Sequence, residues 1–179
     1  MTLCIRKLEK SDCPFVLRIN EENVSVLSPM DEERLRVFET MAELFLLAEC
    51  DGERAGFLIA LREGCEAYES ENYRWFSRHY PRFLYIDRIV IDEPFRGRGI
   101  GCALYERVFA RAADTAVPFV TAEVDTVPYN AESLAFHAAM GFREVGTQSV
   151  RGGSVTVSLL EAAVSGAGDG EISKSVEFC

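Results

Sequence analysis

The sequence contains no long hydrophobic run. None of its apolar stretches approaches the ~18 residues that a membrane-spanning helix needs, although 48% of the 179 residues are hydrophobic. The first ten residues, MTLCIRKLEK, also lack the apolar core of a secretion signal. We therefore expect a cytoplasmic protein that has no membrane partner.

Lysine is scarce, and the cysteines are not grouped. Only three of the 19 basic residues are lysines, so an anion site in this chain would use arginine and backbone amides. The six cysteines form no CxxC pair and no zinc-ligand spacing, so we expect reduced thiols and no metal. The net charge of −10 argues against a nucleic-acid partner and fits a cationic or neutral small substrate.

Length and composition suit one compact domain with a sizeable core. From about Ala162 the sequence is dominated by Gly, Ser, Ala and Glu, a composition typical of flexible segments. We predict a domain over residues 1–161 and a flexible tail over residues 162–179.

Two hairpins are predicted, one on each side of a central strand–helix–strand unit. Two apolar runs meet at Asp51-Gly52, which suits a type I′ turn. The runs 142–150 and 154–162 form the second hairpin, and the apolar segment 83–92 is typical of a strand inside a sheet. The order of these elements predicts an α/β fold (α+β in some schemes), a mixed sheet with helices on its faces.

Helix boundaries are indicated by capping residues. A first strand ends at a cap at Ser11-Asp12, and a short helix follows over 14–20. Ser28 followed by Pro29 predicts the start of the next helix. Near the end of the chain, Asn130 is a predicted N-cap, and Gly141 is the predicted glycine just past the end of that helix.

The segment RGRGIG, residues 96–101, lies between a strand and a helix. Glycine costs about 1 kcal/mol relative to alanine within a helix, so its abundance here needs a reason. Free N–H groups at a helix start attract anions, and glycines let a phosphate approach the backbone. The alternative is a tight turn that needs glycines only for its shape. The nucleotide fingerprints GxGxxG and GxxxxGK[ST] are both absent.

Two motifs at the expected separation resemble those of the GNAT superfamily of acetyl-CoA-dependent N-acetyltransferases. The first is Arg96-Gly-Arg-Gly-Ile-Gly101, which is similar to the family's R/Q-x-x-G-x-G/A turn. The second is NAESLAFHAAMGF, which resembles its N-x-x-A-x-x-x-Y-x-x-x-G-F helix. The resemblance implies a mostly antiparallel sheet of about seven strands, helices on both faces, and a splayed pair of central parallel strands.

The resemblance also implies a binding site for acetyl-CoA. The amides of 96–101 would hold its diphosphate, with added charge from Arg96 and Arg98. Asn130 and the backbone of 89–91 would contact the pantetheine arm and the acetyl carbonyl. The residues expected to bind the coenzyme are Ile89, Val90, Ile91, Arg96, Gly97, Arg98, Gly99, Ile100, Gly101 and Asn130.

The expected reaction is transfer of the acetyl group to a primary amine, on a small molecule or a protein, by direct attack in a ternary complex. Glu123 is the first candidate for a general base, because several family members have a glutamate at the corresponding place. Asp87 is the second candidate and Asp125 the third; each of the three could instead be a structural carboxylate, Asp87 especially because Arg88 adjoins it. His137 occupies the place of the family's usual tyrosine, either as general acid or as a helix-end cation; Tyr129 is a weaker candidate.

Several alternatives remain open at this point. The aromatic segment 68–83, with Glu63 and Glu66 before it, forms either a wall or lid for the acceptor amine or a packing surface. That packing would be over the sheet or at a homodimer contact. The same two alternatives, acceptor binding or a structural role, apply to Glu21 and Glu22. Because the usual tyrosine is missing, the chain could be a GNAT-fold module that binds acyl-CoA without turnover. A third hypothesis is a different phosphate-binding protein, such as a nucleotide binder.

Overall fold

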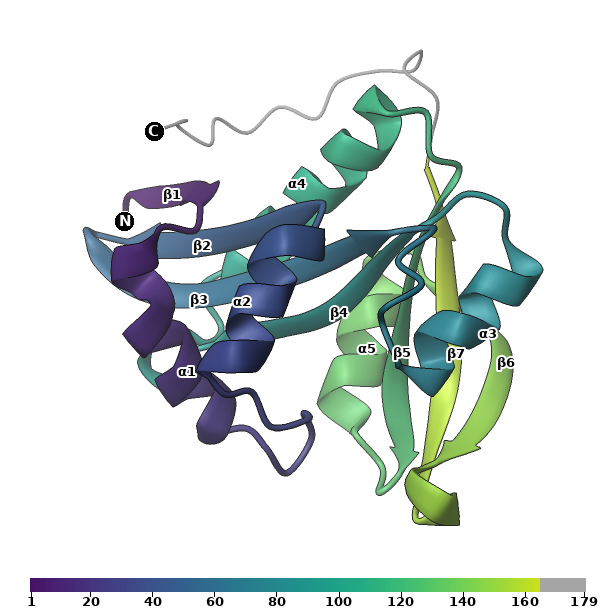
Figure 1. Cartoon of the computed structure of the whole chain (residues 1–179). Helices are drawn as coiled ribbons and strands as arrows, with labels where there is room; N and C mark the ends of the chain where they lie inside the picture. Colours follow the sequence, from purple (N-terminus) through teal and green to yellow (C-terminus); the bar gives the residue numbers. More distant parts are fainter. Residues whose placement is uncertain (165–179) are drawn as a thin grey trace. The chain divides into compact units, whose positions relative to one another are not determined.

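The computed structural model describes residues 1–164 (Figure 1). These residues form two compact units. The first contains Met1–Leu61 and Ile86–Val108, and the second contains Arg62–Tyr85 and residues 109–164. Strand β4 (Leu84–Ile91) and helix α4 (Ile100–Asp114) contribute residues to both units. The tail predicted over 162–179 falls largely outside the described residues, although its first two residues belong to the last strand, which ends at Ala163.

Seven strands form one mixed sheet in the order β1-β2-β3-β4-β5-β7-β6. The recorded strand pairs are antiparallel except β4 with β5, which are parallel, and this arrangement confirms the expected fold class. The remaining strands are β1 (Leu3–Lys7), β2 (Leu44–Cys50), β3 (Glu53–Arg62), β5 (Phe119–Val127), β6 (Arg143–Val150) and β7 (Val155–Ala163).

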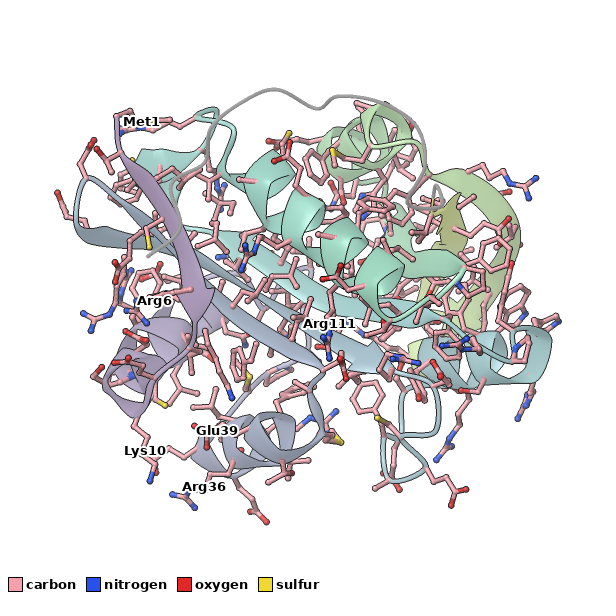
Figure 2. The ribbon with its side chains drawn as sticks, turned by 90° about the horizontal axis from the view of Figure 1, so that it is seen from above. Met1, Arg6, Lys10, Arg36, Glu39 and Arg111 are labelled. Carbon is pink, nitrogen blue, oxygen red and sulfur yellow. The ribbon has the colours of Figure 1, made fainter. Side chains whose placement is uncertain are left out.

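Helices cover both faces of the first unit's strands. Figures 1 and 2 place α1 and α2 on one side of β1–β3 and the beginning of α4 on the other. The four further helices are α1 (Cys13–Glu21), α2 (Glu32–Met41), α3 (Glu71–His79) and α5 (Ala131–Ala139).

Both predicted hairpins are present. Asp51 and Gly52 have φ angles of 53° and 84°, the left-handed pair that a type I′ turn requires. Strands β6 and β7 pair in antiparallel register from Arg143↔Glu161 to Val150↔Val155. Short polar turns between apolar runs were therefore sufficient to locate these elements.

The predicted start of the second helix was wrong. Asp31 is its N-cap, because the Asp31 carboxylate accepts from the Arg34 N–H at 2.8 Å, and the helix begins at Glu32. Ser28 lies three residues earlier, and its side chain and carbonyl both accept hydrogen bonds from Arg88. Ser28, the residue that the sequence suggested as a cap, is therefore bound by an arginine that is distant in the sequence.

The carboxylate of Asp12, a predicted cap, binds arginines instead of the helix that follows it. Its side chain is 0% exposed and lies 2.7 Å from both Arg6 Nη1 and Arg54 Nε. Burial alone would raise the pKa of Asp12, but the hydrogen bonds from these two arginines outweigh burial and hold its pKa well below the usual range. Arg6 also pairs with Glu49, so this cluster joins β1, β2 and β3 to the start of α1.

Asp12→Asn is expected to lower the free energy of unfolding by about 1.5–3 kcal/mol at pH 7, because it removes a buried carboxylate that accepts charge-assisted hydrogen bonds from Arg6 and Arg54. A carboxyl whose pKa is lowered by folding stabilises the protein above its unfolded pKa of about 3.9. The difference between wild type and variant should therefore shrink as the pH falls below 4, which urea unfolding at pH 7 and pH 3 would measure.

Glu32→Gln is the matched control for this change. Glu32 and Arg36 form an exposed pair on α2, with 74% and 68% of their side chains exposed. Such surface pairs contribute about 0–1 kcal/mol. Equal losses in the two variants would contradict the role assigned to the Asp12 cluster.

Candidate active site

The glycine-rich turn leads directly into helix α4. Gly97 and Gly99 have φ angles of 73° and 79°, and a Cβ at either position would meet nothing within 4 Å. The turn is therefore open, and its backbone adopts a conformation that favours glycine. Ala103 donates the first helical hydrogen bond, to the Gly99 carbonyl at 3.1 Å, so the N–H groups of residues 100–102 precede the hydrogen-bond ladder of the helix. A helix start of this kind suits an anion.

The two arginines of the turn have different surroundings. The Arg96 guanidinium donates to the Ile91 carbonyl at 3.1 Å and to the side-chain oxygen of Asn23 at 3.2 Å. These bonds tie the turn to the end of β4 and to the α1–α2 connection. The guanidinium of Arg98 lies 5.2 Å from the centre of the Phe95 ring, and the residue is exposed. Arg98 is thus the arginine better disposed toward an external anion.

The parallel pairing of β4 with β5 is short. It is recorded at Leu84↔Val120 and Tyr85↔Thr121, at the beginning of β4. The expected parallel pairing of the two central strands is confirmed. Val90 is buried, whereas Ile89 and Ile91 are half-buried.

Gly56 on β3 permits β4 to lie close to it at residues 90–91. A Cβ at position 56 would stand 2.6 Å from the Val90 carbonyl oxygen and 2.8 Å from Ile91 Cδ1. Gly56→Ala is expected to lower the free energy of unfolding by about 1–3 kcal/mol, the usual cost of overpacking. Gly64→Ala is the comparison for backbone strain alone, because a Cβ there meets nothing within 4 Å, while its φ of 87° costs about 1–2 kcal/mol. Thermal unfolding of both variants tests the prediction, and an unchanged Tm for Gly56→Ala would contradict it.

Asp87, the second candidate base, lies in a buried ion pair. Its carboxylate is 2.6 Å from Arg88 Nε, and both side chains are almost fully buried. Arg88 also donates to Asn20 and Ser28, and its guanidinium lies 5.2 Å from the centre of the Phe38 ring. This environment matches the structural alternative for Asp87. The sequence indicated the pairing of Arg88 with the adjacent Asp87, but not its contacts with the distant residues Asn20 and Ser28.

Glu123, the first candidate base, lies on β5 beside a tyrosine of β4. The hydroxyl of Tyr85 donates to its carboxylate at 2.8 Å. Tyr85 is buried, and Glu123 is half-buried. A carboxylate in this setting can accept a proton while a neighbouring hydroxyl fixes its orientation. Tyr85 was not predicted as a partner of Glu123, because 38 residues separate the two.

Asn130 and Gly141 delimit helix α5 as predicted. The side-chain oxygen of Asn130 accepts from the Ser133 N–H at 3.1 Å, and Gly141 has a φ of 85°. The Asn130 oxygen therefore caps the helix, and hydrogen bonding to a ligand would fall to its side-chain amide. Tyr129, the residue before it, is 72% exposed.

His137 is buried on α5, with 4% of its surface exposed. Its ring packs edge-on against Phe136 and Phe142. Burial lowers its pKa, an effect that the bond to the Ser133 carbonyl partly opposes, so the neutral imidazole is favoured. Nδ1 lies 2.7 Å from that carbonyl oxygen, which can only accept, so Nδ1 holds the hydrogen. This disfavours the imidazolium needed either for a general acid or for a helix-end cation.

The aromatic segment before β4 contains helix α3 and packs against its own unit. Tyr68, Tyr73 and Phe76 are buried, and the rings of Tyr73 and Phe76 lie within 6 Å of the Tyr85 ring. Tyr73 also donates to the Arg62 carbonyl at 2.6 Å. These contacts match the packing alternative, and they surround the tyrosine that holds Glu123.

The sequence model described as the acetyltransferase (GNAT) family matches residues 6–142 of this chain. The chain belongs to this family. It is thus an acyltransferase, and a GNAT enzyme acetylates an amine on a small molecule or a protein. A search of curated proteins finds no significant match. No group of His, Cys, Asp and Glu suited to a metal ion occurs within residues 1–164, and no helix in that range is long and apolar enough to cross a bilayer.

Solved structures of GNAT acetyltransferases share the fold at low sequence identity. Ard1 from Thermoplasma volcanium is 18% identical, with a TM-score of 0.74, 92% of this chain covered and 99% of that one. Arabidopsis thaliana NAA60, solved with a bisubstrate analogue, is 22% identical, with a TM-score of 0.71 and coverages of 93% and 100%. The ribosomal-protein-S18-alanine N-acetyltransferase from Escherichia coli is 19% identical, with a TM-score of 0.69 and coverages of 94% and 97%.

Proposed function

We propose that this GNAT protein transfers the acetyl group of acetyl-CoA to a primary amine by direct attack in a ternary complex. The observation that supports this most is the open turn before α4, where Gly97 and Gly99 have left-handed backbone angles and the first amides of the helix precede its hydrogen-bond ladder. A diphosphate is the anion that this turn fits, because no Cβ obstructs its approach.

The coenzyme is held by backbone groups more than by charged side chains. The amides of residues 96–101 bind the diphosphate, with Arg98 as the arginine free to approach it. Backbone groups of residues 89–91 and the side-chain amide of Asn130 bind the pantetheine arm. Acetyl-CoA supplies the acetyl group as a thioester, and a carbon–nitrogen bond replaces the carbon–sulfur bond.

Glu123 accepts the proton that the amine must lose. A lysine-type amine has a pKa of about 10.4, so its deprotonation at pH 7 costs about 4.6 kcal/mol, whereas an α-amine near 7.8 costs about 1 kcal/mol. Tyr85 orients the carboxylate through its 2.8 Å hydrogen bond. Asp87 is engaged by Arg88, which leaves Glu123 as the better base.

Protonation of the departing thiolate is a smaller requirement than deprotonation of a lysine-type amine. Because the thiol has a pKa of about 8.5, protonation of the departing thiolate at neutral pH is favourable by at most about 2 kcal/mol. His137 is buried and neutral, and solvent suffices for this step. The absence of the family's usual tyrosine is therefore compatible with turnover.

The test combines binding and turnover. Calorimetry with acetyl-CoA and with free CoA measures the affinity of the protein for the coenzyme. An assay that detects released thiol, run with a panel of amines, measures turnover. Binding together with amine-dependent thiol release is the expected result. Tight binding without release would favour the non-catalytic acyl-CoA module, and binding of a nucleotide triphosphate but not of CoA would favour the third hypothesis.

The acceptor in this proposal is a cationic amine in the cytoplasm. The acidic composition, with a net charge of −10, supports such a partner and not a nucleic acid. Association into a homodimer remains part of the proposal, and size-exclusion chromatography with light scattering would test it.

A further inference from the structure

Three polar side chains follow one another along one face of β5. Thr121, Glu123 and Asp125 are two residues apart, and alternate residues of a strand share a face. Thr121 is paired with Tyr85, whose hydroxyl reaches Glu123, so these residues lie on the same side of the sheet. The intervening residues Val120, Ala122 and Val124 on the opposite face are apolar and buried.

Thr121 and Asp125 each have a buried polar atom that no residue among 1–164 satisfies. Thr121 is 0% exposed, and its Oγ1 makes no hydrogen bond; Asp125 Oδ2 is also buried and makes none. Most buried polar atoms in native proteins have partners, so such atoms call for another explanation. They stand on either side of Glu123, the proposed base. A polar ligand lying along this face would satisfy them.

Asp125 has the charge of a cation-binding group. Burial raises the pKa of Asp125, and the charge of Arg151 partly opposes this effect. A nearby cation would therefore stabilise the ionised carboxylate. Arg151 forms no ion pair with it in the described part of the chain. Asp125 stands two residues beyond Glu123, a separation of about 7 Å along a strand.

We propose that the acceptor of this enzyme is a dication, whose reacting amine lies at Glu123 and whose second, protonated nitrogen binds to Asp125. This inference rests on the proposed function and adds the class of the acceptor to it. Extended aliphatic diamines such as 1,4-diaminobutane and 1,5-diaminopentane have a nitrogen separation comparable to the spacing of the two carboxyl groups. Asp125 is a specificity residue here, and the proton transfer stays with Glu123.

The test compares each diamine with the monoamine of equal chain length, 1-aminobutane or 1-aminopentane. A hydrogen-bonded charge pair contributes about 1.5–3 kcal/mol, or roughly ten- to a hundredfold. In the wild type, kcat/KM for the diamine should therefore exceed that of the monoamine at least tenfold. In Asp125→Asn this ratio should fall to near one, through a higher KM for the diamine, with little change for the monoamine.

The control is Glu132→Gln, an acid-to-amide change at an exposed position of α5. It should keep the wild-type ratio, and all variants should keep the wild-type affinity for acetyl-CoA. Equal kcat/KM for diamine and monoamine in the wild type would overturn the inference, whether or not Asp125→Asn folds. A loss of kcat for both amines in Asp125→Asn would overturn it too. Absence of thiol release with every amine would instead overturn the proposed function.

Discussion

Gly99→Glu is expected to remove acetyl-CoA binding while leaving the fold intact. The new carboxylate would stand in the open turn that we propose as the diphosphate site, and the close approach of like charges costs several kcal/mol. Since 1.4 kcal/mol is a factor of ten in affinity, Kd should rise at least a hundredfold. The position has room for a side chain, because a Cβ at residue 99 meets nothing within 4 Å.

Two controls separate charge from backbone strain. Gly99 has a φ of 79°, so any side chain there imposes a strain of about 1–2 kcal/mol. Gly99→Ala imposes the same strain without the charge and should bind far better than Gly99→Glu. Gly64→Glu introduces the same side chain at a φ of 87° in the second unit and should keep wild-type affinity. Calorimetry and Tm would be measured for all three, and undiminished binding by Gly99→Glu would refute the site.

Glu123→Gln is expected to slow turnover in proportion to the basicity of the acceptor. General bases contribute about 10²–10⁴-fold to rates, and a loss of that order should appear with a lysine-type amine of pKa about 10.4. With an amine of pKa near 7.8 the loss should stay below about tenfold, because much of that amine is already neutral at pH 7. The glutamine oxygen can still accept from the Tyr85 hydroxyl, so the local structure is preserved.

The pH dependence gives this prediction a second readout. As the assay pH rises toward 10, the basic amine loses its proton in solution, and the defect of Glu123→Gln should diminish. Glu106→Gln, an exposed acid-to-amide change on α4, should leave rates unchanged at every pH. Equal losses for amines of high and low pKa would remove Glu123 from proton transfer.

Features that depend on neighbouring residues were predicted well. Asp51-Gly52 makes its hairpin turn and Asn130 caps its helix, because each needs only a partner within a few positions. The glycine turn was also found from local chemistry, since left-handed backbone angles and helix starts are local properties.

Features that depend on distant residues were not predictable in the same way. Ser28 has the chemistry of a cap, but Arg88, 60 residues away, takes its hydroxyl and carbonyl, and Asp31 becomes the cap. Similarly, Tyr85 reaches Glu123 only because two strands lie in parallel. Side-chain partners of this kind are decided by strand order, which one sequence specifies only through the fold as a whole.

The Arg88 network has a consequence for how the α1–α2 connection can evolve. One guanidinium anchors it from inside, through the Asn20 side chain and both oxygens of Ser28. The side chains of Glu21, Glu22 and other outward-facing positions take no part in the Arg88 contacts. Substitutions there can change the surface chemistry without changing the backbone conformation of the connection. Natural variants of this enzyme would then diversify around a fixed arginine, with lysine a poor replacement because it cannot serve several acceptors in one plane.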